Sequence, residues 1–235
     1  MLDILADGGE LGTNEIARRT AMTPSTVSRQ LGTLAAAGLV ERVPASGRYR
    51  LGIRLVQLAN AVLSRLDVRE VARPHLVALV EATGETATLS VPGDDAAITV
   101  DFVSGSHQIQ PVSRLGRPSI GHATSAGKVL LAFASREAPD APLRAFTPRT
   151  ITDPAMLARE LEQVRERGYA TATGEREPGL SAIAAPVRSA DGELEAIVAL
   201  QGPSSRFDEA SAKAALPLLL QRAGAISREL GWTES

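Results

Sequence analysis

Residues 25–33 combine hydroxyl side chains with an arginine, at spacings that place them on one face of a helix. Val27, Leu31 and Leu34 repeat at helical spacing, so the other face is predicted to point into a core. The exposed face then carries Ser25, Thr26, Ser28, Arg29 and Thr33. A helix of this kind can lie in the major groove of DNA, where hydroxyls and a guanidinium reach phosphates and base edges.

Capping residues predict where this helix begins and ends. Thr23 can accept hydrogen bonds from free backbone N–H groups of the first turn. Pro24 suits the first helical position, because its missing N–H costs nothing there, and Gly38 is placed to end the helix. Upstream, Thr13 is expected to cap a shorter helix over residues 14 to about 19. Two helices joined by a tight turn form a helix-turn-helix.

A predicted β-hairpin follows the two helices. Residues 39–43 and 48–51 flank the turn Pro44-Ala45-Ser46-Gly47, and such a hairpin is the wing of a winged helix. Residues 1–55 carry a formal charge of +2 and the remainder −4, which fits phosphate binding by the head alone. Residues 1–52 are therefore expected to bind double-stranded operator DNA, the alternative being a winged helix used for protein contacts. The candidate DNA contacts are Thr13, Ser25, Thr26, Ser28, Arg29, Thr33, Arg48 and Tyr49.

A second segment with chemical potential spans residues 116–128. It is not a P-loop, because five residues separate Gly121 from Gly127 and Val129 follows the lysine. Ser125 and Lys128 match the S-x-x-K nucleophile motif of serine acyl-enzymes, but the K-T-G strand and the S-D-N motif that accompany it are absent. We favour a helix start whose free N–H groups at residues 124–127 bind an anion; a helix start packed without a ligand is the alternative.

Residues 168–187 read as a strand, an acidic loop and a strand with small side chains. This arrangement suits one wall of a pocket and adds Glu175 to the candidate site, although a solvated hairpin would also explain its carboxylates. His122, beside the anion-binding turn, is the one histidine assigned a functional role, with structural hydrogen bonding as its alternative. The chain has no cysteine and no close cluster of histidines and carboxylates, so we expect no metal and no cofactor.

The rest of the 235-residue chain predicts an α+β architecture. Residues 53–82 read as a linker of two amphipathic helices whose apolar stripe could pack on a partner subunit. Residues 83–235 alternate between strands and helices, with Asp191-Gly192 as a hairpin turn. The strands are expected at 86–91, 97–103, 107–113, 169–174, 180–188 and 194–201, and the helices at about 124–134, 153–167 and 208–230.

Membrane and secretion signals are absent from the pattern. No apolar run is long enough to span a bilayer, and the N-terminus has no basic segment followed by an apolar one. We therefore expect a cytoplasmic protein without a membrane partner. The helical pattern starts at Met1 itself, which is consistent with a chain that continues upstream.

With these blocks in place, the chain resembles the IclR-type transcription regulators over nearly its whole length. Three motifs carry the resemblance: Ser25-Thr26-x-x-Arg29-x-Leu31-x-x-Leu34 with the wing ending Tyr49-Arg50-Leu51-Gly52, His122-Ala123-Thr124-Ser125-Ala126-Gly127-Lys128, and Gly168-Tyr169-Ala170 with Glu175-x-x-Pro178-Gly179-Leu180. The resemblance implies a winged helix-turn-helix head, a helical linker and a GAF-like effector domain with a mixed sheet flanked by helices. It also implies a homodimer or dimer of dimers, acting as repressor or activator without catalysis.

The resemblance further implies that a small organic acid or aromatic effector changes the affinity for DNA. Mapped onto matching positions and joined to His122 and Glu175, the expected effector site is Ser119, His122, Ser125, Ala126, Ala172, Glu175, Leu180 and Ala182. Many relatives carry an acid at the position of Ala172 and a larger or polar residue at Ala182. We therefore expect a wide, apolar site and a bulkier or less polar ligand. The rivals are an acyl-transferring hydrolase built on Ser125 and Lys128, and a constitutive DNA binder with an empty sensor domain.

Overall fold

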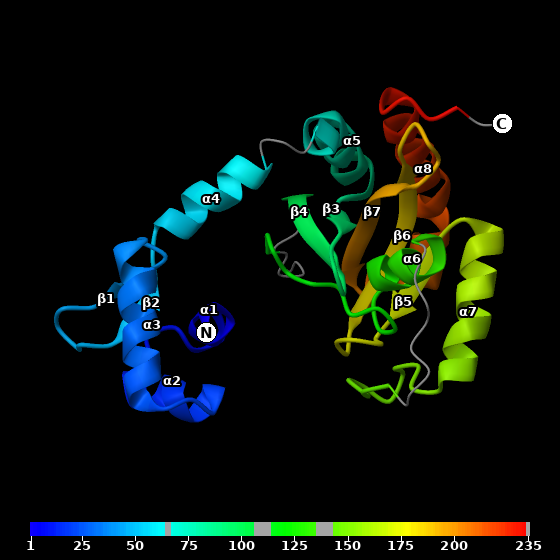
Figure 1. Cartoon of the computed structure of the whole chain (residues 1–235). Helices are drawn as coiled ribbons and strands as arrows, with labels where there is room; N and C mark the ends of the chain where they lie inside the picture. The colour runs from blue at the N-terminus through cyan, green and yellow to red at the C-terminus, as the bar shows by residue number, and fades with distance from the viewer. Residues whose placement is uncertain (64–66, 106–113, 135–142, 234–235) are drawn as a thin grey trace. The chain divides into compact units, whose positions relative to one another are not determined.

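The computed structural model describes residues 1–63, 67–105, 114–134 and 143–233, which belong to two compact units, Met1–Leu66 and Asp67–Ser235 (Figure 1). The expected linker is divided between these units. Its first helix, α4 (Arg54–Leu63), belongs to the first unit, and its second, α5 (Asp67–Thr83), belongs to the second. Among the described residues, no helix is long and apolar enough to cross a membrane.

The first unit is the predicted winged helix-turn-helix. Before α4 its elements are α1 (Leu2–Gly8), α2 (Thr13–Thr20), α3 (Pro24–Ala36), β1 (Val40–Arg42) and β2 (Tyr49–Leu51). The two strands pair antiparallel, with Val40 opposite Leu51, and form the expected wing. A small core holds the unit together: Leu5, Leu11, Ile16, Ala17, Val27, Leu31 and Val40.

Local hydrogen bonds set both ends of α3, as the sequence predicts. The Thr23 hydroxyl accepts from the Thr26 N–H. At the other end Gly38, with φ +70°, donates to the Ala35 carbonyl while Leu39 donates to the Leu34 carbonyl, both at 2.9 Å, which is a Schellman motif. This exit from the helix needs a left-handed residue, and glycine adopts that conformation without strain.

The predicted cap of α2 is wrong by one residue. Thr13 is the first residue of the helix, and Gly12 is the N-cap. The Ile16 N–H bonds to the Gly12 carbonyl at 3.0 Å, so the chain enters the helix one residue earlier than a Thr13 cap would require. The hydroxyl of Thr13 therefore does not cap the helix.

The second unit is built on a five-stranded sheet in the order β4-β3-β7-β6-β5. Its strands are β3 (Thr86–Pro92), β4 (Ala97–Val103), β5 (Ala170–Thr173), β6 (Leu180–Arg188) and β7 (Leu194–Pro203). All of these pairs are antiparallel, which corrects the expected mixed sheet. The physical reason is connectivity: β3–β4 and β6–β7 are joined by short turns, and parallel neighbours would need long crossovers. The strand expected at 107–113 lies outside the described residues.

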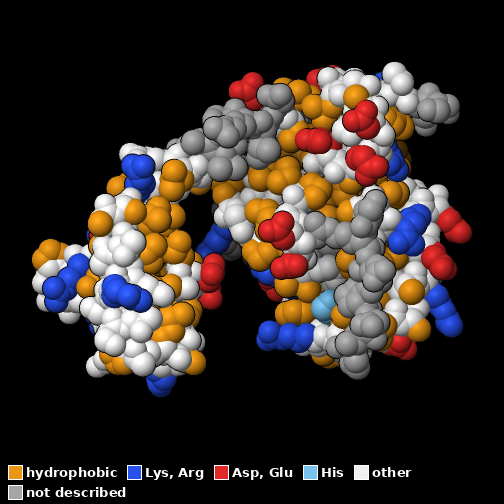
Figure 2. All heavy atoms as spheres, in the orientation of Figure 1, with side chains coloured by type: hydrophobic (Ala, Val, Ile, Leu, Met, Phe, Trp, Pro, Cys, Tyr) orange, Lys and Arg blue, Asp and Glu red, His pale blue; other side chains and the backbone are white. Residues whose placement is uncertain are grey.

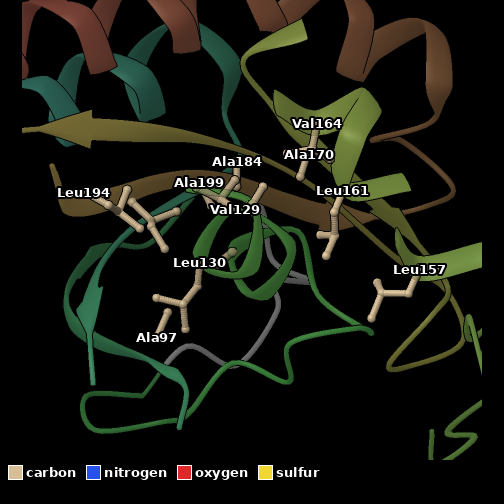
Figure 3. Close-up of a cluster of buried hydrophobic side chains, with 13 residues drawn as sticks. Ala97, Val129, Leu130, Leu157, Leu161, Val164, Ala170, Ala184, Leu194 and Ala199 are labelled. Atoms are coloured by element: carbon tan, nitrogen blue, oxygen red, sulfur yellow. The ribbon is translucent and has the colours of Figure 1, made fainter. Parts of the chain in front are cut away.

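Helices cover both faces of this sheet. α5 and α8 (Glu209–Glu229) pack on one face, while α6 (Ser125–Phe133) and α7 (Pro154–Arg167) pack on the other. The apolar side chains of α5, which the sequence analysis offered to a partner subunit, therefore pack against the sheet and α8 of their own unit. Figure 3 shows the core under α6, where Val129 lies near Ala184 and Ala199 of the sheet and Leu130 lies near Ala97.

Two contacts fix where α6 begins. The Thr124 hydroxyl accepts from the Gly127 N–H at 3.0 Å and donates to the Ile120 carbonyl at 2.9 Å. A Cβ on Gly127 would come within 2.3 Å of that same Ile120 oxygen, so no larger residue fits. The start of α6 is therefore held tightly against the preceding turn, and this turn forms one side of the cavity described below.

Candidate DNA interface and ligand cavity

The outer face of α3 carries the predicted polar side chains, which differ in solvent exposure and in the hydrogen bonds that they already make. Ser25, Ser28 and Arg29 are exposed, while Thr26 is half-buried and its hydroxyl lies 2.9 Å from that of Thr23. The exposed Thr33 donates its hydroxyl to the Arg29 carbonyl at 3.2 Å. Within the described part of the chain, the Arg29 guanidinium makes no hydrogen bond or ion pair. It is the charged group of α3 that is free to meet a phosphate or a base.

The wing arginines already have partners in the head. Arg48 donates to the Glu10 carbonyl at 3.1 Å, and Arg50 pairs with Glu41 and, at 3.6 Å, with Glu10. Tyr49 is half-buried, packs against the head core and pairs with Leu11 through the backbone. Arg48 remains exposed and can still reach DNA with its other N–H groups.

Thr13, Arg18 and Arg19 belong to α2, the first helix of the helix-turn-helix. Thr13 is half-buried at the first turn of α2. Arg19 pairs with Glu15 at 2.6 Å and Arg18 lies 4.0 Å from the same carboxylate. Exposed pairs of this kind are weak, so they do not prevent either arginine from contacting a phosphate.

A cavity of about 80 Å³ lies between the sheet and the start of α6. Its floor is one face of the sheet, because Ala182 lies opposite both Ala172 and Gln201 in the strand register. Thr88, opposite Ala199, continues the same face. Ser125 and Ala126 bring the first turn of α6 to the opposite side. The anion-binding turn and the small-residue strands of the sequence analysis therefore meet at one place.

Seven of the eight residues expected at the effector site line this cavity: Ser119, Ser125, Ala126, Ala172, Glu175, Leu180 and Ala182. The eighth, His122, is not among the lining residues. Its ring is buried, its Nε2 lies 2.9 Å from the Arg144 carbonyl oxygen, and it lies beside the Phe146 ring with centroids 5.8 Å apart. This geometry corresponds to the structural alternative for His122.

Three arginines that sequence reasoning missed also line the cavity: Arg114, Arg117 and Arg176. Arg176 donates to the Pro118 carbonyl at 3.0 Å, and Arg117 donates to Glu177. Burial, and then the nearby charge of Arg117, lower the pKa of Arg176, which Glu177 opposes. The cavity lining therefore holds three guanidiniums against two carboxylates, those of Glu175 and Glu177.

The lining of this cavity mixes alanines with hydroxyl and charged side chains. Thr88, Ser90 and Thr99 add hydroxyls to the arginines, and the volume of about 80 Å³ is small. The pattern could have indicated this, because Thr88 and Ser90 alternate within an otherwise apolar strand and so face one side of the sheet. The sequence indicated the arginines of the cavity less clearly. Arg114 and Arg117 precede the turn that leads into α6, whereas Arg176 lies in the loop between β5 and β6, far later in the chain.

Beside the cavity lies a buried ion pair. Lys128 is 2% exposed, and its Nζ donates to Glu175 Oε1 at 2.8 Å and to the Thr171 carbonyl at 3.0 Å. Glu160 lies 3.8 Å from the same Nζ and is itself paired with Arg167 at 2.7 Å. Burial raises the pKa of Glu175, and the charge and hydrogen bond of Lys128 oppose that rise. Within the described residues, Glu175 Oε2 is buried without a hydrogen-bond partner.

This pair bears on the rival acyl-enzyme. A serine nucleophile next to a lysine needs that lysine as a neutral base, close to the hydroxyl. Here Lys128 Nζ is instead engaged by the Glu175 carboxylate and the Thr171 carbonyl, to which it donates. Among the described residues, no group of three or more histidines, aspartates and glutamates could hold a metal ion.

A winged helix-turn-helix followed by an α+β unit with a polar cavity defines a DNA-binding regulator with a ligand domain. Comparison with known families gives the particular family. Residues 1–44 match the IclR helix-turn-helix domain, and residues 60–228 match the family described as bacterial transcriptional regulator IclR C-terminal. The chain belongs to the IclR family of transcriptional regulators.

Individual relatives cover almost the whole chain. The HTH-type transcriptional regulator BhcR of Paracoccus denitrificans is 37% identical over 97% of this chain and 83% of its own length. The structure of the Thermotoga maritima IclR is 33% identical, with a TM-score of 0.74 over 98% of this chain and 96% of that one. An IclR homolog from Microbacterium hydrocarbonoxydans, complexed with 4-hydroxybenzoate, is 29% identical, with a TM-score of 0.77 over 94% and 91%.

The buried pair predicts a pH-dependent effect of Lys128→Met. Removing one partner of a buried pair leaves the other unpaired, at a cost of about 3–5 kcal/mol in the free energy of unfolding. Without Lys128 the pKa of Glu175 should rise further, so the carboxyl is neutral, and less costly to bury, at low pH. The loss of stability should therefore be largest at neutral pH and shrink as the pH falls through that raised pKa.

Denaturant unfolding of the full chain at several pH values measures this loss. Lys213→Met is the matched control, because Lys213 is exposed on α8 and should change stability by less than about 0.5 kcal/mol. A Lys128→Met deficit that is the same at every pH would contradict an electrostatic origin.

Proposed function

We propose that α3 reads operator DNA through its exposed face and that the cavity binds a small organic anion, which changes the affinity of the protein for DNA. The observation that carries the second part is the group of three arginines, Arg114, Arg117 and Arg176, beside the start of α6. The 4-hydroxybenzoate complex of the Microbacterium hydrocarbonoxydans homolog supports a small-molecule effector.

The charges around the cavity support an anionic effector. Burial and the charge of Arg117 both disfavour the charged form of Arg176. A carboxylate between the two guanidiniums would relieve that repulsion and accept charge-assisted hydrogen bonds from both. The first turn of α6 at Ser125 and Ala126 adds free N–H groups and the positive end of the helix dipole.

The volume limits the effector to a small molecule. One buried water needs roughly 10–15 Å³ of such space, so a cavity of about 80 Å³ holds several non-hydrogen atoms before any side chain moves.

We propose no catalytic step for Ser125, because Lys128 is held by Glu175. As a DNA-binding regulator the protein would act in the cytoplasm, where the chromosome lies.

Exposed apolar side chains on α4 and just before it support a homo-oligomer, either a dimer or a dimer of dimers. Ile53, just before the helix, is 73% exposed, and Val56 and Leu58 are 53% and 45% exposed. Large apolar side chains gathered on one short segment favour burial against another protein surface. A second copy of the same segment would bury them by two-fold symmetry, the commonest arrangement of soluble homo-oligomers.

Arg29→Ala should weaken operator binding by about 1–3 kcal/mol if Arg29 contacts a base edge. The measurement is binding of the full chain to an operator selected from random duplexes by the wild-type protein. Arg159→Ala is the control, because it removes an exposed arginine of α7 outside the head. Equal losses on operator and random DNA would mean that Arg29 contacts phosphate alone, and a folded variant that binds within two-fold of wild type would remove Arg29 from the interface.

The full chain should behave as an oligomer at micromolar concentration. Light scattering at ordinary salt measures its mass, and Val56→Glu should shift the distribution toward monomer, because the new charge would be buried in the interface. Val77→Glu, at a similarly large exposed apolar residue of α5, is the comparison. A monodisperse wild-type monomer would rule out the proposed oligomer.

Ala182→Phe should abolish the response to the effector while leaving DNA binding intact. The ring would fill the cavity at the centre of its floor, whereas α3 belongs to the other unit. Operator binding with and without effector, together with ligand-induced thermal stabilisation, measures both properties. Ala158→Phe, at an exposed position of α7, is the control. Full responsiveness of folded Ala182→Phe would place the effector elsewhere.

A further inference from the structure

Glu175, whose side chain lines the cavity, has one carboxylate oxygen that is buried and has no hydrogen-bond partner within the described residues. The Glu175 side chain is 12% exposed and lines the cavity. Its Oε1 accepts from Lys128 at 2.8 Å, while Oε2 is buried and has no hydrogen-bond partner within the described part of the chain. Buried polar atoms are nearly always hydrogen-bonded, so an unsatisfied one next to a cavity indicates a group that arrives from outside.

The charge state of Glu175 decides what that group must be. Lys128 is 2% exposed, and a charged ammonium buried this deeply needs a counter-charge. The other nearby carboxylate, Glu160, lies farther away at 3.8 Å and is shared with Arg167. Glu175 is therefore the main counter-charge of Lys128, and the hydrogen bond from the Lys128 ammonium favours its carboxylate form against burial, which raises the pKa of Glu175. An ionised carboxylate oxygen only accepts hydrogen bonds, so Oε2 needs a donor.

From this geometry, and resting on the proposed function of the cavity, we propose that the effector is a hydroxy acid. Its carboxylate binds among Arg114, Arg117 and Arg176, and its hydroxyl donates to Oε2 of Glu175. Glu175 is then a specificity-determining residue of the effector site, and it selects the hydroxyl rather than the acid group.

A hydroxyl fits this position better than an ammonium group. The negative charge of Glu175 is already balanced by Lys128, whose Nζ is 2.8 Å from the other oxygen of the same carboxylate. Three guanidiniums line the same small cavity, and the further carboxylate there, that of Glu177, is already bonded to Arg117. A further cation would meet these charges at short range with little water to screen them. A keto group offers no hydrogen at all and would bring its lone pairs toward those of Oε2.

The expected preference is large enough to measure. A hydrogen bond to a charged group changes affinity by about tenfold to a hundredfold. Protein sites that hydrogen-bond a ligand hydroxyl reject the analogue that lacks it, because the partner atom is left buried and unpaired. We expect the hydroxy acid to bind at least about tenfold more tightly than the unsubstituted acid of the same carbon skeleton.

The test uses matched acids as probes on the full chain. Each set has one carbon skeleton, from three to six carbons or one aromatic ring, as the unsubstituted acid and its hydroxy, keto or amino derivatives. Isothermal titration gives the affinities. Preference for the hydroxy member of the skeletons that bind supports the proposal. Equal binding of hydroxy and unsubstituted acids, or tighter binding of the amino acid, overturns it and leaves the anionic effector in place; binding of no acid overturns both.

Glu175→Gln provides a sharper arm of the test. If the amide oxygen keeps the contact with Lys128, the amide nitrogen takes the place of Oε2, so an acceptor becomes a donor. The preference should then invert toward the keto acid. Glu162→Gln is the matched control: it makes the same change at an exposed position of α7 that does not line the cavity, so the ratio of hydroxy to unsubstituted acid should stay as in wild type.

Circular dichroism and thermal unfolding check that both variants fold. A folded Glu175→Gln protein that keeps the wild-type preference for the hydroxy acid would overturn the assignment of Glu175. If that variant does not fold, the matched acids on the wild-type chain still decide the proposal, because they compare ligands and leave the protein unchanged.

Discussion

The buried pair of Lys128 and Glu175 is the interaction on which the arrangement of the second unit depends. It joins α6 to the loop between β5 and β6 across 47 residues of sequence. Neither charge could be buried alone without a cost of several kcal/mol, so the helix and the loop hold each other in place. The same contact brings the first turn of α6 and the arginine-bearing loop to two sides of one cavity.

The face of the sheet under α6 serves two purposes, because one part is covered by the apolar core and the next part lies under the cavity. Ala184 belongs to the apolar core beneath α6, whereas Ala182, two residues earlier on the same strand face, lies in the cavity floor. Ala172 and Ala199 also line the floor, and none of the three fills the space above it. Alanine at these positions leaves a cavity where larger side chains would have closed the core.

Charge in the head is less available than its formal value indicates. Arg48 and Arg50 of the wing and Arg19 of α2 all contact groups within the head. Arg29 has no such contact within the described residues. A count of basic residues points to the head as the unit that meets phosphates, and the hydrogen bonds of the folded head distinguish Arg29 from the arginines that are already engaged.

The sequence by itself determined the elements whose ends depend on contacts between near neighbours. The Thr23 cap, the Gly38 exit and the Thr124 turn each use hydrogen bonds that reach across only a few residues, so residue type and spacing were sufficient to predict them. The winged helix-turn-helix and the α+β sheet followed from the same kind of local signal. Even there, Thr13 was placed one position wrongly, because Gly12 can also begin a helix.

Only the tertiary structure decided the chemistry of the cavity. Arg114 and Arg176 come together from distant parts of the chain, and no periodicity relates them. Whether Glu175 is a solvated loop carboxylate or the buried partner of Lys128 depends on burial, which changes its pKa and leaves one oxygen unsatisfied. Burial and long-range pairing are properties of the folded chain, and they place charged and hydroxyl side chains beside the alanines that the sequence analysis nominated.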